Sequence, residues 1–147
     1  MSTHPPILNR SLEIARALYS VDFGGRRCWH LSLLFERSKL LLIAENSTKT
    51  HARNIHNNQK AKFDLGKKQT CSEMVLFRRA KNKFANLKWN RWTLVNIRID
   101  ALGQVKNSYP CVHCENLLID YLKIKKLYYT TEQGDFEKLC LDPIYSP

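Results

Sequence analysis

The chain has 147 residues, of which 44% are hydrophobic, and this length and composition fit one globular domain with its own core. Its 24 Lys and Arg residues against 13 Asp and Glu give a formal net charge of +11, which favours polyanionic partners, nucleic acid before membrane lipid. No apolar stretch approaches the roughly 20 residues needed to cross a bilayer, because Glu36, Arg37 and Lys39 interrupt the longest one.

The N-terminal half predicts a helix, a hairpin and the start of another helix. Residues 7–20 carry apolar side chains at spacings of three and four after two prolines, which is typical of an amphipathic helix. Two apolar runs, 29–35 and 40–44, lie on either side of a short polar connection and predict a β-hairpin. Residues 45–49 are rich in helix-capping side chains, so a second helix is expected from residue 50, with His51 in its first turn.

A basic segment occupies the middle of the chain. Residues 57–91 contain ten basic and two acidic residues and so supply +8 of the net charge. Its second half interleaves aromatic rings with cations, including Arg78, Arg79, Lys81 and Lys83, as surfaces that bind single-stranded nucleic acid do. Phe77, Phe84 and Leu87 also stand at helical spacing, so a helix with a buried stripe and a solvated basic face is the other interpretation.

The C-terminal half alternates strands with a helix. Residues 92–99 and 125–130 are rich in strand-forming residues, and residues 111–122 have a helical pattern. A hairpin followed by alternating strands and helices predicts an α/β fold, with a mixed sheet covered by helices. We expect one domain over residues 1–147. The N-terminus has no signal-peptide pattern, so the expected location is intracellular, cytoplasmic or nuclear, without a membrane partner.

The motif Pro110-Cys111-Val112-His113-Cys114 places two thiols three residues apart at a helix start. Helix N-termini favour the thiolate that a metal requires. A C-x-x-C pair alone fits either a redox or a zinc site. With His51 it makes a three-ligand zinc site with an open fourth position, while two buried cysteines left from a decayed site are the alternative. The other cysteines, Cys28, Cys71 and Cys140, are interpreted as packing residues.

The sequence resembles the cytidine and deoxycytidylate deaminase zinc-binding family over roughly residues 7–140. The resemblance is carried by Asn46, by Thr50-His51-Ala52, by residues 107–114 and by residues 124–131. It implies a cytidine-deaminase-like three-layer fold, a Zn²⁺ ion held by His51, Cys111 and Cys114, a substrate contact from Asn46, and a homo-oligomer. Residues 60–88 are then expected as a basic insertion.

Arg53 stands where that family has the glutamate that moves protons during deamination. A guanidinium has only donors and stays protonated, so it is neither a general base nor a proton shuttle. Loss of such help costs roughly 10²- to 10⁴-fold in rate. Arg53 could instead make the zinc pocket suited to an anion such as phosphate, or simply face solvent.

Three functional hypotheses follow. The first is a deaminase-fold pseudoenzyme that keeps zinc and works by binding single-stranded nucleic acid, a nucleotide or a protein partner. The second is an active zinc-dependent deaminase, a hydrolase of C–N bonds in cyclic amidines, whose proton shuttle is relocated to Glu45 or to another subunit's carboxylate. Glu115 and His56 are weaker substitutes, because helix geometry turns them away from the ligands. The third is a nucleic-acid-binding module with a structural zinc site.

Overall fold

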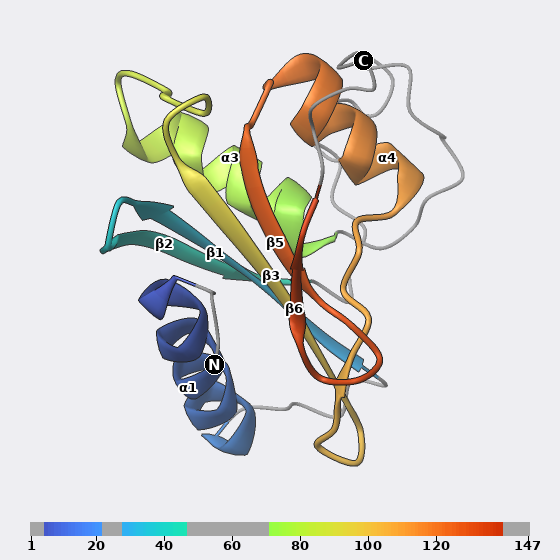
Figure 1. Cartoon of the computed structure of the whole chain (residues 1–147). Coiled ribbons are helices and arrows are strands. Elements are labelled where there is room, and N and C mark those ends of the chain that lie inside the picture. The colour runs from blue at the N-terminus through green and yellow to red at the C-terminus, as the bar shows by residue number, and fades with distance from the viewer. Residues whose placement is uncertain (1–4, 22–27, 47–70, 140–147) are drawn as a thin grey trace.

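The computed structural model of the chain describes residues 5–21, 28–46 and 71–139 (Figure 1). The elements, in chain order, are α1 (Pro6–Val21), β1 (Cys28–Glu36), β2 (Lys39–Glu45), α3 (Ser72–Lys83), β3 (Thr93–Asp100), β4 (Val105–Lys106), α4 (Val112–Glu115), the π-helix η1 (Asn116–Tyr121), β5 (Lys126–Thr130) and β6 (Phe136–Lys138). The helix expected from residue 50 lies outside the described residues. None of the described helices is long and apolar enough to cross a membrane.

The strands form one mixed sheet in the order β2-β1-β3-β5-β6, with β4 paired to β3 beside this path. β3 and β5 are parallel and the other pairs are antiparallel. Helix α1 covers one face of the sheet, and α3, α4 and η1 lie on the other (Figure 1). The expected α/β fold with helices on both faces of a mixed sheet is therefore confirmed, as a three-layer arrangement consistent with a deaminase-like domain.

Two hydrophobic clusters hold the layers together, because alternate residues of a strand point to opposite faces of the sheet. Leu33, Val95 and Ile97 face α1, where they pack with Leu8 and Ala15. On the other face, Leu34, Leu94 and Leu127 pack against residues from α3 and from η1. The central strands are buried on both faces, which explains why their sequences are almost continuously apolar.

Helix α3 comes from the middle of the basic segment but is part of the core. Its residues Met74, Leu76 and Ala80 are fully buried. The helix begins earlier than the spacing of Phe77, Phe84 and Leu87 indicated, and it ends before Phe84, whose backbone is extended. The Phe84 ring lies outside the helix and packs on that of Trp92, with 5.3 Å between the two ring centres. Residues 72–83, expected within an insertion, thus form a helix of the α/β layers.

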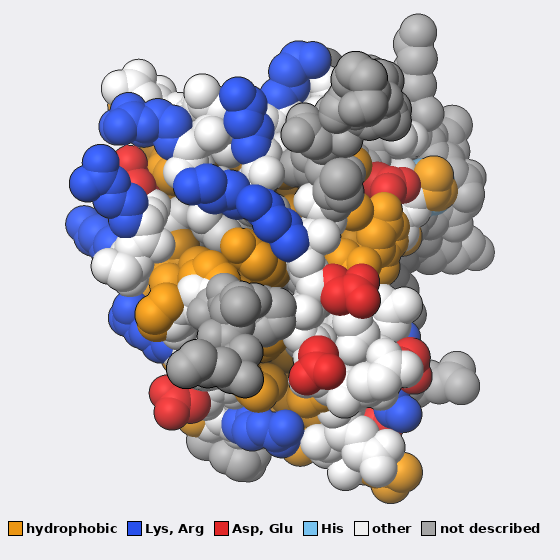
Figure 2. All heavy atoms as spheres, in the orientation of Figure 1, with side chains coloured by type: hydrophobic (Ala, Val, Ile, Leu, Met, Phe, Trp, Pro, Cys, Tyr) orange, Lys and Arg blue, Asp and Glu red, His pale blue; other side chains and the backbone are white. Residues whose placement is uncertain are grey.

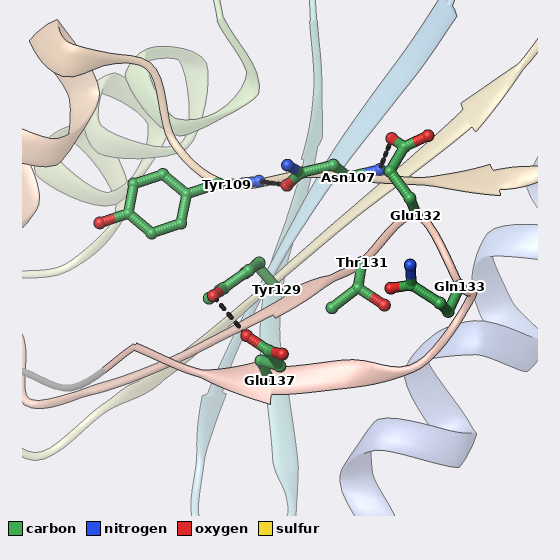
Figure 3. Close-up of a pocket in the computed structure, with 7 residues that line it drawn as sticks. All are labelled: Asn107, Tyr109, Tyr129, Thr131, Glu132, Gln133 and Glu137. Carbon is green, nitrogen blue, oxygen red and sulfur yellow. Dashed lines mark hydrogen bonds between the residues drawn. The ribbon is translucent and has the colours of Figure 1, made fainter.

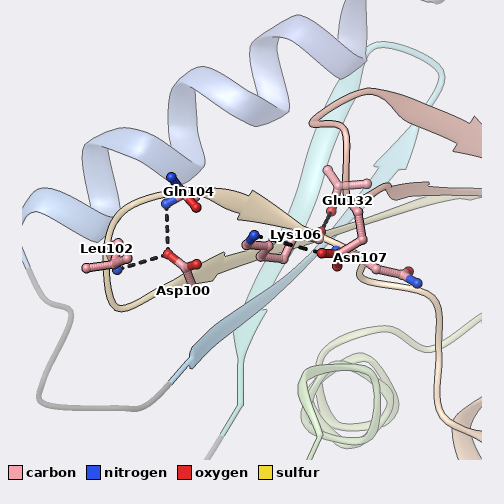
Figure 4. Close-up of polar contacts among 7 residues, drawn as sticks. Asp100, Leu102, Gln104, Lys106, Asn107 and Glu132 are labelled. Carbon is pink, nitrogen blue, oxygen red and sulfur yellow. Dashed lines mark hydrogen bonds and ion pairs between the residues drawn. The ribbon is translucent and has the colours of Figure 1, made fainter.

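The connection between β3 and the cysteine motif is pinned by side chains. Asp100 Oδ1 accepts hydrogen bonds from the backbone N–H groups of Leu102 and Gln104, each 2.9 Å long (Figure 4). After β4, the Asn107 backbone N–H donates to Glu132, 2.9 Å away. These contacts fix the segment that leads to Cys111. β4 and β6 are two and three residues long, and neither was predicted.

Candidate metal centre

Three cysteines from two helices meet on the α3 face of the sheet. Cys71 is the N-cap of α3, Cys111 is the N-cap of α4, and Cys114 lies within α4. Their Sγ atoms all lie within 4.8 Å of one another, and those of Cys71 and Cys111 are 3.9 Å apart. Cys114 is buried and the other two are half-buried, and none of the three forms a disulfide. The pair expected from the C-x-x-C motif is therefore joined by a third thiol.

The spacing of the sulfur atoms fits a zinc ion. Zinc binds cysteine sulfur at about 2.3 Å, and tetrahedral geometry then places two such sulfurs roughly 3.8 Å apart. The distance of 3.9 Å between Cys71 and Cys111 agrees with this value. Three thiolates are a known ligand set of zinc and leave a fourth position open. The centre is thus a candidate three-cysteine zinc site.

The crowding of the thiols opposes their ionisation when no cation is present. The hydrogen bond with Cys111 is the largest influence on Cys71, and with burial and the charge of Glu73 it raises the pKa of the Cys71 thiol to about 12. Hydrogen bonds with Cys111 and Cys71, together with burial, raise the pKa of Cys114 well above its usual value. A divalent cation removes this obstacle because it balances the charge of the thiolates.

A buried carboxylate lies beside the cysteines. Glu73, in the first turn of α3, is only 5% exposed. Its Oε2 accepts a hydrogen bond of 3.0 Å from Asn96 Nδ2, and its Oε1 accepts one of 3.2 Å from the Ser72 hydroxyl. Its negative charge contributes to the raised pKa of both Cys71 and Cys114. Burial of a carboxylate is costly unless it is hydrogen-bonded, so these contacts hold Glu73 in place.

Asn96 connects Glu73 to the sheet. The Ser32 hydroxyl, on β1, donates to Asn96 Oδ1 over 2.8 Å and lies 2.7 Å from the Ser72 hydroxyl. Ser32, Ser72, Glu73 and Asn96 therefore form a closed ring of polar contacts, and all four residues are buried. Because Ser32 donates its proton to Asn96, the single Ser72 proton goes either to Ser32 or to an ionised Glu73. A buried network of this kind favours one geometry, because each partner that turns away leaves a polar group unpaired.

Asn96→Ala is expected to lower the free energy of unfolding by about 2–3 kcal/mol, because it leaves Ser32 and the carboxylate of Glu73 without their shared partner. Urea denaturation of the full chain measures this change. Asn86→Ala is the matched control, since Asn86 is exposed in the loop after α3 and its loss is expected to cost less than about 0.5 kcal/mol. Equal losses in the two variants would contradict a structural role for the network.

Of the residues expected at the site, the structure brings together Cys111 and Cys114. Asn46 follows β2, where its Oδ1 accepts a hydrogen bond of 3.0 Å from the backbone N–H of His30. His51 and Arg53 lie outside the described residues, so their roles stay predictions. His113 is half-buried within the motif.

The four cations expected to contact nucleic acid differ in their surroundings. Arg79 is exposed but donates a hydrogen bond of 2.9 Å to the Ile43 carbonyl, which ties α3 to β2. Arg78 is half-buried. Lys81 and Lys83 are exposed near the end of α3, each above an aromatic ring.

The two substitute carboxylates of the sequence analysis are engaged elsewhere. Glu45 follows Ala44, which faces α3, so its side chain points to the opposite face of the sheet. There its Oε2 accepts a hydrogen bond of 3.0 Å from the indole of Trp29. Glu115 accepts a hydrogen bond from the Tyr109 hydroxyl. Glu73 is thus the described carboxylate whose charge acts on the thiols of Cys71 and Cys114.

A pocket of about 280 Å³ begins at Tyr109, two residues before Cys111 (Figure 3). Its lining is polar and aromatic, and consists of Asn107, Tyr109, Tyr129, Thr131, Glu132, Gln133 and Glu137. The rings of Tyr109 and Tyr129 meet edge to face, 5.0 Å apart, and the Tyr129 hydroxyl donates to Glu137 over 2.8 Å. Amide and carboxylate groups around two rings suit a polar ligand that donates hydrogen bonds.

No protein-family model matches the chain, and no curated protein matches its sequence.

Sequence reasoning missed Cys71 and Glu73, although a signal was present. Zinc deaminases pair a first ligand with a glutamate two residues later at the start of a helix. Cys71-Ser72-Glu73 has this spacing and opens α3. The pattern is inconspicuous because Cys71 stands 40 residues before Cys111.

Proposed function

We propose that this protein is a zinc-dependent deaminase, with Cys71, Cys111 and Cys114 as the zinc ligands and Glu73 as the group that moves protons. The observation that carries the proposal is a buried carboxylate held beside three clustered thiols. Three protein ligands with an open fourth position are typical of a catalytic zinc site rather than a closed structural one. The family resemblance of the sequence points to cytosine as the base.

The chemistry is hydrolytic: cytosine and water give uracil and ammonia. Zinc in such a site acts as a Lewis acid that lowers the pKa of water to about 7 and so supplies a nucleophile at neutral pH. The carboxylate of Glu73 takes a proton from the attacking water as the C–O bond forms at C4 of the base. It delivers this proton to the ring nitrogen, then takes the second proton from the hydroxyl now on C4 and passes it to the leaving amino group as the C–N bond breaks.

The pseudoenzyme hypothesis depended on Arg53, because no proton-moving carboxylate was expected near the ligands. Glu73 supplies such a carboxylate from a different position in the sequence. The described contacts support this assignment, since Asn96 and Ser72 hold both carboxylate oxygens of Glu73. We therefore favour the active enzyme, with its proton shuttle at Glu73 rather than at Glu45.

The proposal is tested by incubating the full chain, loaded with zinc, with cytidine, deoxycytidylate and a single-stranded oligonucleotide that contains one cytosine. We expect at least one of these substrates to be deaminated, to uridine, deoxyuridylate or a strand in which uracil replaces cytosine. We also expect about one zinc per chain, and loss of turnover after chelation that added zinc restores. Chromatographic detection of the deaminated product, together with metal analysis, measures these results. Zinc-loaded protein that deaminates none of the three would overturn the proposal.

A further inference from the structure

Exposed cations gather at one end of the molecule, away from the cysteines. Nine Lys and Arg side chains from four segments make up this cationic end: Arg37, Lys39, Lys81, Lys83, Lys88, Arg91, Lys123, Lys125 and Lys126, all of them exposed. The same segments carry Glu36, which is half-buried, and Asp120. Figure 2 shows Lys and Arg side chains gathered at the upper left, with Asp and Glu more frequent elsewhere.

The register of the sheet explains why these segments meet. Thr93, at the start of β3, pairs with Phe35 near the end of β1 and with Lys126 at the start of β5. The β1–β2 turn, the residues before β3 and those before β5 therefore lie at the same end of the sheet, where these strands begin or end. Contact between the rings of Phe84 and Trp92 brings the end of α3 to this end of the sheet as well. Figure 1 shows the end of α3 beside the start of β3.

The charges of the cationic end are not balanced within the described chain. None of the nine side chains forms an ion pair with another described residue. By contrast, Lys106, on β4, lies 3.8 Å from Glu132. Like charges gathered at one end repel one another, and a polyanion that binds there relieves this repulsion.

An exposed aromatic ring stands among these cations. Tyr121, at the end of η1, is 67% exposed. Its ring meets that of Phe77 edge-on at 6.4 Å, and Lys81 Nζ lies 5.2 Å from the centre of the Phe77 ring. Tyr121 thus exposes much of its side chain to solvent and shares Phe77 as a neighbour with Lys81. Rings and cations in combination are the features with which proteins bind single strands, since bases stack on the rings and phosphates meet the cations.

We propose that the cationic end binds single-stranded nucleic acid, with phosphates on its Lys and Arg side chains and a base stacked on Tyr121. That the strand is also a substrate rests on the proposed function. Ten residues of α3 separate Glu73 from Lys83, a helical rise of about 15 Å. At about 3.4 Å per stacked nucleotide, roughly five nucleotides span this distance. Strands longer than this reach both sites, whereas mononucleotides reach only one.

The first test measures binding of a fluorescent 12-nucleotide single strand to the full chain by anisotropy at several salt concentrations. We expect Lys81→Gln/Lys125→Gln to weaken binding about tenfold, and to reduce the slope of log affinity against log salt by up to about 1.4. Arg16→Gln/Lys106→Gln makes the same change in net charge on α1 and β4, and is expected to bind like the wild type. Equal losses in the two variants, or binding that salt does not weaken, would overturn the inference.

The second test concerns the ring. Tyr121→Ala is expected to weaken binding about tenfold, whereas Tyr121→Phe keeps the ring and the affinity. A duplex or an acidic peptide that binds as tightly as the single strand would contradict the assignment of the partner. Glu73→Gln separates this inference from the proposed function, because it is expected to bind the strand normally. Uracil formation without strand binding would refute the surface alone, and strand binding without uracil formation would refute the enzyme alone.

Discussion

Glu73→Gln is expected to lower kcat for cytosine deamination by roughly 10²- to 10⁴-fold and to leave the zinc content unchanged. An amide oxygen accepts hydrogen bonds but does not take up a proton at neutral pH, so the variant loses the proton transfers and keeps the shape of the side chain. Steady-state kinetics and metal analysis on the same preparation measure the two quantities.

The fold is expected to survive this substitution. The amide oxygen of a glutamine still accepts from Asn96, and its amide group faces the Ser72 hydroxyl, which also accepts hydrogen bonds. Unchanged unfolding in urea, within about 0.5 kcal/mol, checks this expectation. A large loss of kcat in a folded, zinc-loaded variant then reports on proton transfer rather than on structure.

Glu45→Gln and Glu115→Gln are the matched controls, since each replaces a different carboxylate by its amide. Glu45 points away from the cysteine face and Glu115 accepts from Tyr109, so both variants are expected to keep wild-type turnover. If Glu45→Gln lost activity and Glu73→Gln kept it, the proton shuttle would lie at Glu45, as one hypothesis from the sequence held.

The architecture was predictable because each long strand or helix has a regular spacing of apolar residues, which can be read from a short stretch of sequence. The expected strands at 29–35, 40–44, 92–99 and 125–130 are all present as β1, β2, β3 and β5, within one or two residues. β4 and β6 were missed because strands of two and three residues have no detectable period. Their formation depends on pairing with β3 and β5, which is a tertiary property.

The start of α3 was harder to predict because its sequence mixes signals. The basic residues around Arg78 suggested a solvated segment, although the preceding Met74 to Phe77 are buried. At the other end, Leu87 continues the helical spacing but is 40% exposed and lies outside the helix. After the helix ends, Phe84 packs on Trp92. This contact joins residues outside the helix and cannot be seen in the spacing of apolar residues alone.

The candidate site was half predictable, for a physical reason. Cys111 and Cys114 are close in sequence, so their spacing alone places them together in one turn of helix. The third thiol of the cluster comes from another helix, and Cys71 joins the pair only because α3 packs on the same face of the sheet as the segment that carries the motif. His51 lies at the start of an expected helix, and Cys71 at the start of the observed helix α3. The sequence alone does not say which of the two is the better candidate for the third metal ligand.

Cys71→Ala is expected to weaken zinc binding by more than the 10- to 100-fold that loss of an outer-shell partner typically costs, because it removes one of three ligands. Competition with a chromogenic chelator measures the affinity, and metal analysis after dialysis measures the zinc that remains. His51→Ala is the matched comparison, since the sequence predicted His51 as a ligand. Loss of zinc in Cys71→Ala and its retention in His51→Ala identify the three-cysteine set, and the reverse result would restore the ligand set predicted from the sequence.

Proton release and spectroscopy give independent readouts of the same centre. Because the pKa of the metal-free Cys71 thiol is raised to about 12 and that of Cys114 is also raised, both thiols carry protons at neutral pH. A zinc ion must displace these protons, so zinc binding is expected to acidify a weakly buffered solution and to weaken as the pH falls. Cobalt(II) in place of zinc is expected to show sulfur-to-metal charge-transfer absorption that decreases in Cys71→Ser, since the hydroxyl is not a thiolate. Absorption that stayed the same in this variant would place the third ligand elsewhere, and Glu73 would then lose the neighbouring metal on which its proposed role depends.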